Sequence, residues 1–126
     1  MSLQKWKLLK EEDVSPSKWF PLFKHTAELP NGKIVDDYYV AKLGDLSTII
    51  AITESQKILF VKQYKHGVLD LMIELPAGRI RPGLTPLEAA KKEFKEETGF
   101  LADKFIEIGY VIPIPSKDPS KVFGFI

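Results

Sequence analysis

The segment GRIRPGLTPLEAAKKEFKEETGF, Gly78 to Phe100, decides how this chain folds. Thr85 has the side chain of a helix N-cap, a proline takes the first helical position, and a glutamate follows the cap by three residues. This arrangement is a capping box with proline at its favoured place. Gly99 suits the left-handed residue that ends a helix. The pattern therefore predicts a helix over residues 86–98.

One face of this helix is apolar enough to pack on a core. At about 100° per residue, four side chains share that face. They are Leu87, Ala90, Phe94 and Thr98.

The edge of the same helix is acidic. Glu93 and Glu97 stack at i,i+4 spacing and Glu96 lies close by. Like charges at this spacing cost about 0.2–0.5 kcal/mol. Carboxylates in the last turn oppose the helix macrodipole, at about 0.3–1 kcal/mol each. A bound cation is the simplest compensation, and oxygen ligands without cysteine suit Mg²⁺ or Mn²⁺.

A solvated acidic face is the alternative explanation of these glutamates. Glu88 and Lys92, and then Lys92 and Glu96, form ordinary i,i+4 pairs of opposite charge. From the helix alone, both interpretations stay open.

The surrounding residues make the metal site the preferred interpretation. Residues 78–100 resemble the Nudix box, G-x5-E-x7-R-E-U-x-E-E-x-G-U, where U is apolar. Two defined positions differ, since Leu84 replaces the first glutamate and Lys92 replaces the arginine. In the family, those two positions hold the loop and orient a metal-binding glutamate. The matching positions are Gly78, Glu93, Phe94, Glu96, Glu97, Gly99 and Phe100.

The flanking segments resemble the ADP-ribose pyrophosphatase group of Nudix hydrolases. VKQYKHGVLDLMIELPAG, residues 61–78, is similar to that group's V-R-Q-Y-R … E-L-P-A-G stretch, with Lys62 and Lys65 in place of the arginines. IPSKDPSKVFGFI is similar to its S-P-G-x-S-D-E segment, with Lys121 about where the glutamate would stand. The resemblance covers roughly residues 28–126.

The resemblance implies a site and a reaction. It makes Glu93 and Glu97 the main metal ligands and Glu96 a partial third, these glutamates being the catalytic residues, and Ala77 supplies a backbone carbonyl to the metal. The metal would be Mg²⁺ or Mn²⁺. The reaction would hydrolyse a nucleoside diphosphate linked to another group, with ADP-ribose giving AMP and ribose 5-phosphate. The substrate contacts would come from Lys65, Tyr38 and Ser116.

The expected fold class is α+β, a Nudix-type α/β/α sandwich of mixed, mostly antiparallel strands that is cut short at its C-terminus. The later loop glutamate, the general base of the resembled group, has no counterpart here. We expect an N-terminal β subdomain and dimerisation region at residues 1–45 and a partial Nudix domain at 46–126. Strand patterns cover residues 19–29, 34–43, 47–53, 57–64, 69–75, 104–112 and 121–126.

Two of these expectations concern pairing. Residues 47–53 and 57–64 are expected to form a hairpin around Glu54-Ser55-Gln56. The apolar run VFGFI would be an unpaired, aggregation-prone edge unless another segment or subunit covers it. With the resemblance, this predicts a homodimer.

Composition limits the partners. The chain has 126 residues, which is enough for one core, and a formal net charge of +1, which argues against broad electrostatic binding to nucleic acid or an anionic membrane. It has no cysteine, and no apolar run approaches the roughly 20 residues that span a bilayer. We therefore expect a cytoplasmic protein whose partner is a small nucleoside diphosphate.

Two other functions remain open at this point. A Nudix-fold protein that is inactive or weakly active would serve as a nucleotide-binding or interaction module. A hydrolase of another nucleotide sugar or of a dinucleotide would share the metal site and differ only in the pocket.

Overall fold

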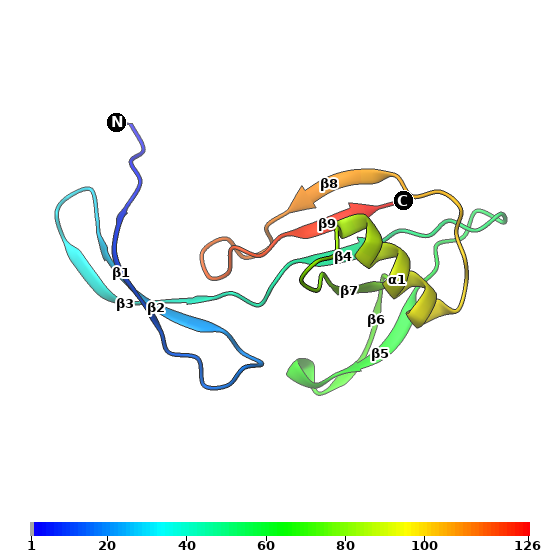
Figure 1. Cartoon of the computed structure of the whole chain (residues 1–126), viewed down its shortest axis with the longest axis horizontal. Helices are drawn as coiled ribbons and strands as arrows, with labels where there is room; N and C mark the ends of the chain where they lie inside the picture. The colour runs from blue at the N-terminus through cyan, green and yellow to red at the C-terminus, as the bar shows by residue number, and fades with distance from the viewer. Residues whose placement is uncertain (1) are drawn as a thin grey trace. The chain divides into compact units, whose positions relative to one another are not determined.

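A computed structural model describes residues 2–126, shown in Figure 1. By its contacts the chain divides into two compact units. One contains the chain up to Leu43 together with Ile114–Ser120, and the other contains Gly44–Pro113 and Lys121–Ile126. Strands and one α-helix make up the described residues, so the α+β class is confirmed. None of the helices in the described part of the chain is long and apolar enough to cross a membrane.

The first unit holds a three-stranded antiparallel sheet of order β1-β2-β3, formed by β1 (Lys7–Asp13), β2 (Leu22–Glu28) and β3 (Ile34–Ala41). The predicted hairpin of β2 with β3 is confirmed. Its turn is closed where Leu29 N–H donates to the Lys33 carbonyl over 2.8 Å. Strand β1 was not predicted, because KLLKEED is exposed almost throughout and shows no alternation of apolar and polar residues.

The second unit is built on a four-stranded sheet that carries the helix. Its order is β7-β4-β9-β8, with β4 and β9 parallel and the other pairs antiparallel. The strands are β4 (Leu46–Ile49), β7 (Ala77–Arg79), β8 (Glu107–Val111) and β9 (Val122–Phe125), and the helix is α1 (Pro86–Thr98). The helix matches the predicted bounds.

A small apolar core joins the helix to this sheet. Ala90 and Phe94 of α1 are buried against Ile49 of β4 and Phe125 of β9. Leu87, which the face analysis assigned to this core, is 37% exposed, and Ala89 is buried in its place. The buried stripe therefore keeps residues 90 and 94 of the predicted face and is shifted toward residue 89.

Other segments of the same chain cover the run VFGFI, which is one of the two possibilities that the sequence left open. Strand β9 pairs on one side with β4 and on the other with β8. Phe125 is 1% exposed. Unpaired backbone at this run therefore gives no reason to expect a dimer.

The hairpin predicted for residues 47–64 forms only at its tip, around the predicted turn. Strand β4 already has β7 and β9 as neighbours, so no side is left for β5 (Val61–Lys65). At the tip, Thr53 N–H donates to the Lys57 carbonyl over 2.9 Å and Leu59 N–H donates to the Ala51 carbonyl over 3.0 Å. Ile52 and Ile58 form an isolated antiparallel bridge between them. β5 pairs instead with β6 (Asp70–Glu74) across the short 3-10 helix η1 (His66–Val68), as a two-stranded ribbon.

Candidate functional site

The helix that carries the acidic residues begins and ends as its sequence dictates. Thr85 accepts a hydrogen bond from the Glu88 N–H over 3.2 Å, and the Glu88 carboxylate accepts one from the Thr85 N–H over 2.9 Å. Gly99 ends the helix with φ of 74°. Both ends are thus fixed, and so is the direction in which the glutamates of the last two turns project.

Glu93 lies directly over the backbone of Gly78 in β7. A Cβ atom built on Gly78 would come within 2.1 Å of the Glu93 Cδ and 2.3 Å of its Cγ. Carbon atoms in contact normally stay about 3.5–4.0 Å apart. Any side chain at residue 78 would therefore displace Glu93, which explains in physical terms why the segment begins with glycine.

Glu97 is held by two strands. One carboxylate oxygen accepts from the backbone N–H of Ala77 over 3.1 Å, and the other accepts from the Gln63 side chain over 3.3 Å. Glu97 is half-buried. The structure thus brings two glutamates of α1, which lie one helical turn apart, against two adjacent residues of β7. The glutamates are Glu93 and Glu97, and the strand residues are Ala77 and Gly78.

The electrostatics of this group favour a positive ligand. Burial raises the pKa of Glu93 above its usual range, and the neighbouring charges of Glu96 and Glu97 raise this pKa further. Arg81 and Lys92 oppose the increase. A carboxylate whose pKa is raised by burial and by like charges is a mark of functional sites, although structural networks can produce it too.

Glu96 differs from the other two glutamates in its exposure and in its partner. It is exposed, and its carboxylate lies 4.0 Å from the Lys92 ammonium in an i,i+4 pair. Within residues 2–126, no three histidine, cysteine, aspartate or glutamate side chains are placed to hold a metal ion together. The carboxylate oxygens of Glu93 and Glu97 and the carbonyl oxygen of Ala77 are the type of ligand that a hard cation prefers. The participation of Glu96 remains a prediction.

The three residues expected to contact substrate have other partners in the structure. Lys65 of the second unit forms an ion pair with Glu74 over 3.1 Å, with both side chains partly exposed. In the first unit, the Tyr38 hydroxyl donates to the Ser116 carbonyl. Lys117 lies over the Tyr38 ring at 5.0 Å.

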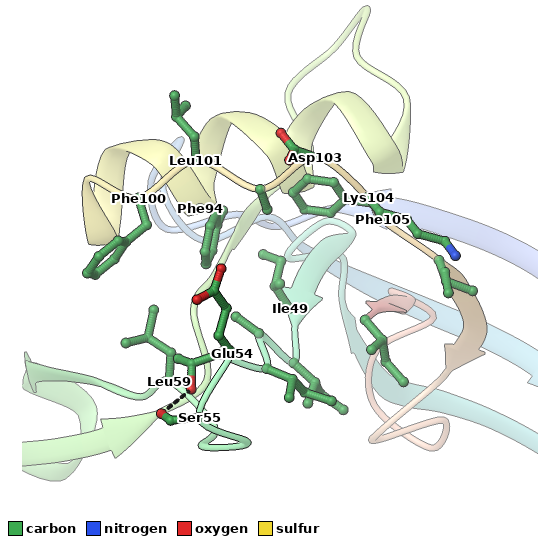
Figure 2. Close-up of a pocket in the computed structure, with 17 residues that line it drawn as sticks. Ile49, Glu54, Ser55, Leu59, Phe94, Phe100, Leu101, Asp103, Lys104 and Phe105 are labelled. Atoms are coloured by element: carbon green, nitrogen blue, oxygen red, sulfur yellow. Dashed lines mark hydrogen bonds between the residues drawn. The ribbon is translucent and has the colours of Figure 1, made fainter.

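A large cavity of about 970 Å³ lies on the core side of α1 (Figure 2). Phe94, Phe105, Ile49 and Leu59 line it, as do other mostly apolar side chains. None of the three box glutamates is among its lining residues. The cavity is therefore separate from the acidic group, and its lining carries no cluster suited to phosphate chemistry.

Sequence reasoning missed one contributor to the site. Gln63 was quoted only as part of the similar segment at residues 61–78, and the bond that it makes crosses 34 residues of chain. The only signal was its place between Lys62 and Tyr64 in that segment. No local pattern reveals such a contact, because it depends on how the β5–β6 ribbon meets α1.

Comparisons with known proteins match the part of the chain that contains the acidic group to a known family. Residues 45–123 match the family model described as the NUDIX domain, and residues 6–41 match the model described as the nucleoside diphosphate sugar hydrolase N-terminal domain. An ADP-ribose pyrophosphatase of Bacillus subtilis (strain 168) is 33% identical over 102 residues, which cover 81% of this chain and 55% of that protein.

Two further relatives are ADP compounds hydrolases. The ADP compounds hydrolase NudE of Escherichia coli (strain K12) is 30% identical over 122 residues, covering 96% of this chain and 65% of that protein. A crystal structure of an ADP compounds hydrolase superposes with a TM-score of 0.88 at 28% identity, over 99% of this chain and 68% of the other. The chain thus spans about half to two thirds of the length of these proteins.

Proposed function

The chain belongs to the Nudix family, and on that premise we propose that it hydrolyses a nucleoside diphosphate linked to another group, in a metal-dependent reaction. ADP-ribose is the substrate that we propose, with AMP and ribose 5-phosphate as products. The observation that carries this proposal is the pair Glu93 and Glu97, both set against the Ala77–Gly78 backbone.

The proposed metal is Mg²⁺ or Mn²⁺. Glu93 and Glu97 would hold it, with Glu96 and the Ala77 carbonyl assisting. When bound, such an ion neutralises the charge of a diphosphate and lowers the pKa of a water. Gly78 leaves the space in which the Glu93 side chain lies, and the hydrogen bonds from β5 and β7 fix the Glu97 carboxylate.

The choice of substrate is supported by the names of the relatives, which are an ADP-ribose pyrophosphatase and an ADP compounds hydrolase. We propose that Lys65 exchanges its partner Glu74 for a substrate phosphate, because an exposed ion pair is worth only about 0–1 kcal/mol. Tyr38 and Ser116 are proposed as further substrate contacts.

The remaining features of the proposal concern the whole protein. We propose a homodimer in the cytoplasm, with no nucleic acid or membrane partner, and a division into residues 1–45 and 46–126. The match of residues 6–41 to an N-terminal domain of nucleoside diphosphate sugar hydrolases supports a separate N-terminal region. The net charge of +1 supports a small-molecule partner.

A second candidate function is nucleotide binding without useful catalysis. Two observations favour it. Lys92 pairs with Glu96, and the described residues hold no group of three histidine, cysteine, aspartate or glutamate side chains placed to bind a metal ion. Tight nucleotide binding without a metal requirement would distinguish this function from hydrolysis.

The proposal is tested by the release of AMP from ADP-ribose by the purified chain, with Mg²⁺, with Mn²⁺ and with a chelator. Other nucleotide sugars and dinucleotides are assayed in parallel. We expect metal-dependent AMP release, and its loss in Glu97→Gln with the fold retained by circular dichroism. A folded chain that is silent on every substrate overturns the proposal, and so does a Glu97→Gln variant of undiminished activity.

A further inference from the structure

Gln63 connects the β5–β6 ribbon to the acidic group on α1. It is half-buried, and its side-chain amide donates to Glu97 over 3.3 Å, at the long end of the range for such bonds. Its neighbour Lys62 is exposed and alternates to the other face of the strand. The amide of Gln63 is thus directed by the pleat of β5 toward the helix.

The two bonds to Glu97 leave it free to bind a cation. A carboxylate offers about four lone-pair positions, and Ala77 and Gln63 occupy one on each oxygen. Both donors are neutral, so they orient the carboxylate without cancelling its charge. A lysine or arginine in the place of Gln63 would orient the group as well but would compete with the cation for it.

The side chains at the two box positions that differ do not hydrogen-bond to Glu97. Leu84 carries no polar group, and the Lys92 ammonium lies at Glu96. In the described residues, the hydrogen bonds that Glu97 accepts come from β5 and β7. In this structure, the orientation of Glu97 therefore depends on β5 and β7.

We propose that Gln63 is a positioning residue for Glu97 and sets the affinity of the site for its divalent cation. The proposal rests on the proposed function in so far as Glu97 is a metal ligand. Hydrogen-bond partners of metal ligands typically change metal affinity by about 10- to 100-fold when they are removed. We expect an effect of that size for Gln63.

The experiment compares the wild-type chain with Gln63→Met, which keeps the length of the side chain and removes its donors. Lys62→Met, on the other face of the same strand, is the matched control. Mn²⁺ affinity is measured without substrate by electron paramagnetic resonance. The Mg²⁺ concentration for half-maximal hydrolysis, kcat at saturating Mg²⁺ and Tm are measured on the same samples.

Gln63→Met should bind Mn²⁺ about 10- to 100-fold more weakly and need correspondingly more Mg²⁺, with kcat at saturating Mg²⁺ far less affected. Lys62→Met should behave as the wild type. Gln63→Lys, which restores a contact with Glu97 and so protects the fold, should also bind Mn²⁺ weakly because its ammonium neutralises the carboxylate. Gln63→Asn, which keeps the amide but shortens its reach, keeps the proposal testable if Gln63→Met unfolds: weaker Mn²⁺ binding supports the proposal, and unchanged binding overturns it.

Unchanged Mn²⁺ affinity in Gln63→Met overturns the proposal, as does a loss of kcat at saturating metal without a change in affinity. A wild-type chain that binds Mn²⁺ but does not hydrolyse any substrate removes the proposed function alone, and the affinities still decide the role of Gln63. A wild-type chain that binds no Mn²⁺ overturns both.

Discussion

Replacing Gly78 by alanine tests the close approach of Glu93 to β7. The backbone of Gly78 has no left-handed φ, so alanine is tolerated there without strain of the main chain. Its Cβ would lie 2.1 Å from the Glu93 Cδ. To reach an ordinary carbon–carbon separation of about 3.5 Å, the Glu93 carboxyl carbon must retreat by about 1.4 Å.

A displacement of that size should matter far more for catalysis than for stability. Misplacing a catalytic group by about 1 Å can cost about 100-fold in rate, or about 2.7 kcal/mol. The clash itself is with the end of a flexible side chain, so the cost should fall at the low end of the about 1–3 kcal/mol seen for overpacking. Alanine also restricts the unfolded chain more than glycine does, which stabilises the folded state by about 0.4–1 kcal/mol and offsets part of the overpacking cost.

The assay is kcat and the metal requirement for hydrolysis of ADP-ribose, with Tm measured on the same samples. Gly124→Ala is the matched control, because its Cβ would meet Ile108 at 2.9 Å in the same sheet and no carboxylate. We expect Gly78→Ala to lose about 100-fold in kcat while its Tm stays close to that of Gly124→Ala. Wild-type activity in Gly78→Ala would refute the reasoning, since Glu93 would then have moved without consequence.

Three further predictions concern charge and capping. Glu93→Gln should abolish hydrolysis and raise Tm at neutral pH. The raised pKa of Glu93 means that the folded state favours the protonated carboxyl, so the wild-type protein loses stability as pH rises through the folded-state pKa. Glutamine is neutral at every pH and avoids that loss. The increase in Tm of Glu93→Gln over the wild type should vanish on acidification. A Tm below that of the wild type at neutral pH would contradict the prediction. Glu11→Gln should lower Tm at neutral pH, because hydrogen bonds from Lys42 and then His25 lower the pKa of Glu11. The stability that Glu11 provides is present above its pKa in the unfolded state and is lost as pH falls through its pKa in the folded state. A Tm difference between Glu11→Gln and the wild type that is the same at every pH would contradict the prediction. Thr85→Ala should cost about 1 kcal/mol in chemical denaturation through loss of the N-cap, and an unchanged midpoint would show that the cap is dispensable.

The sequence predicted the elements whose cause is local. The bounds of α1 follow from the capping box and Gly99, and the β2–β3 hairpin follows from its turn. Strand β1 carries no pattern of its own and forms because β2 offers an edge. The partners of β4 were missed because parallel pairing with β9 depends on a segment far away in the chain.

The candidate site also contains features that local sequence predicts and features that depend on distant segments. Helical spacing predicted that Glu93 and Glu97 lie side by side, and the family resemblance made them site residues. The structure sets both against the start of β7. The hydrogen bond from Gln63 and the bond between Tyr38 and Ser116 span 34 and 78 residues. Such contacts arise from tertiary packing, which no window of sequence contains.

The parallel pairing of β4 with β9 also sets the order of events during synthesis. The contact between Asp45 and Lys121, at the start of this pairing, joins residues 76 apart. At about 5–20 residues per second, a ribosome needs roughly 4–15 s to make that stretch. Throughout that interval Ile49 lacks the Phe125 side chain that completes its core, and Phe94 lacks it from the time that it is made. The nascent chain therefore holds these apolar groups without their native cover until β9 has been made.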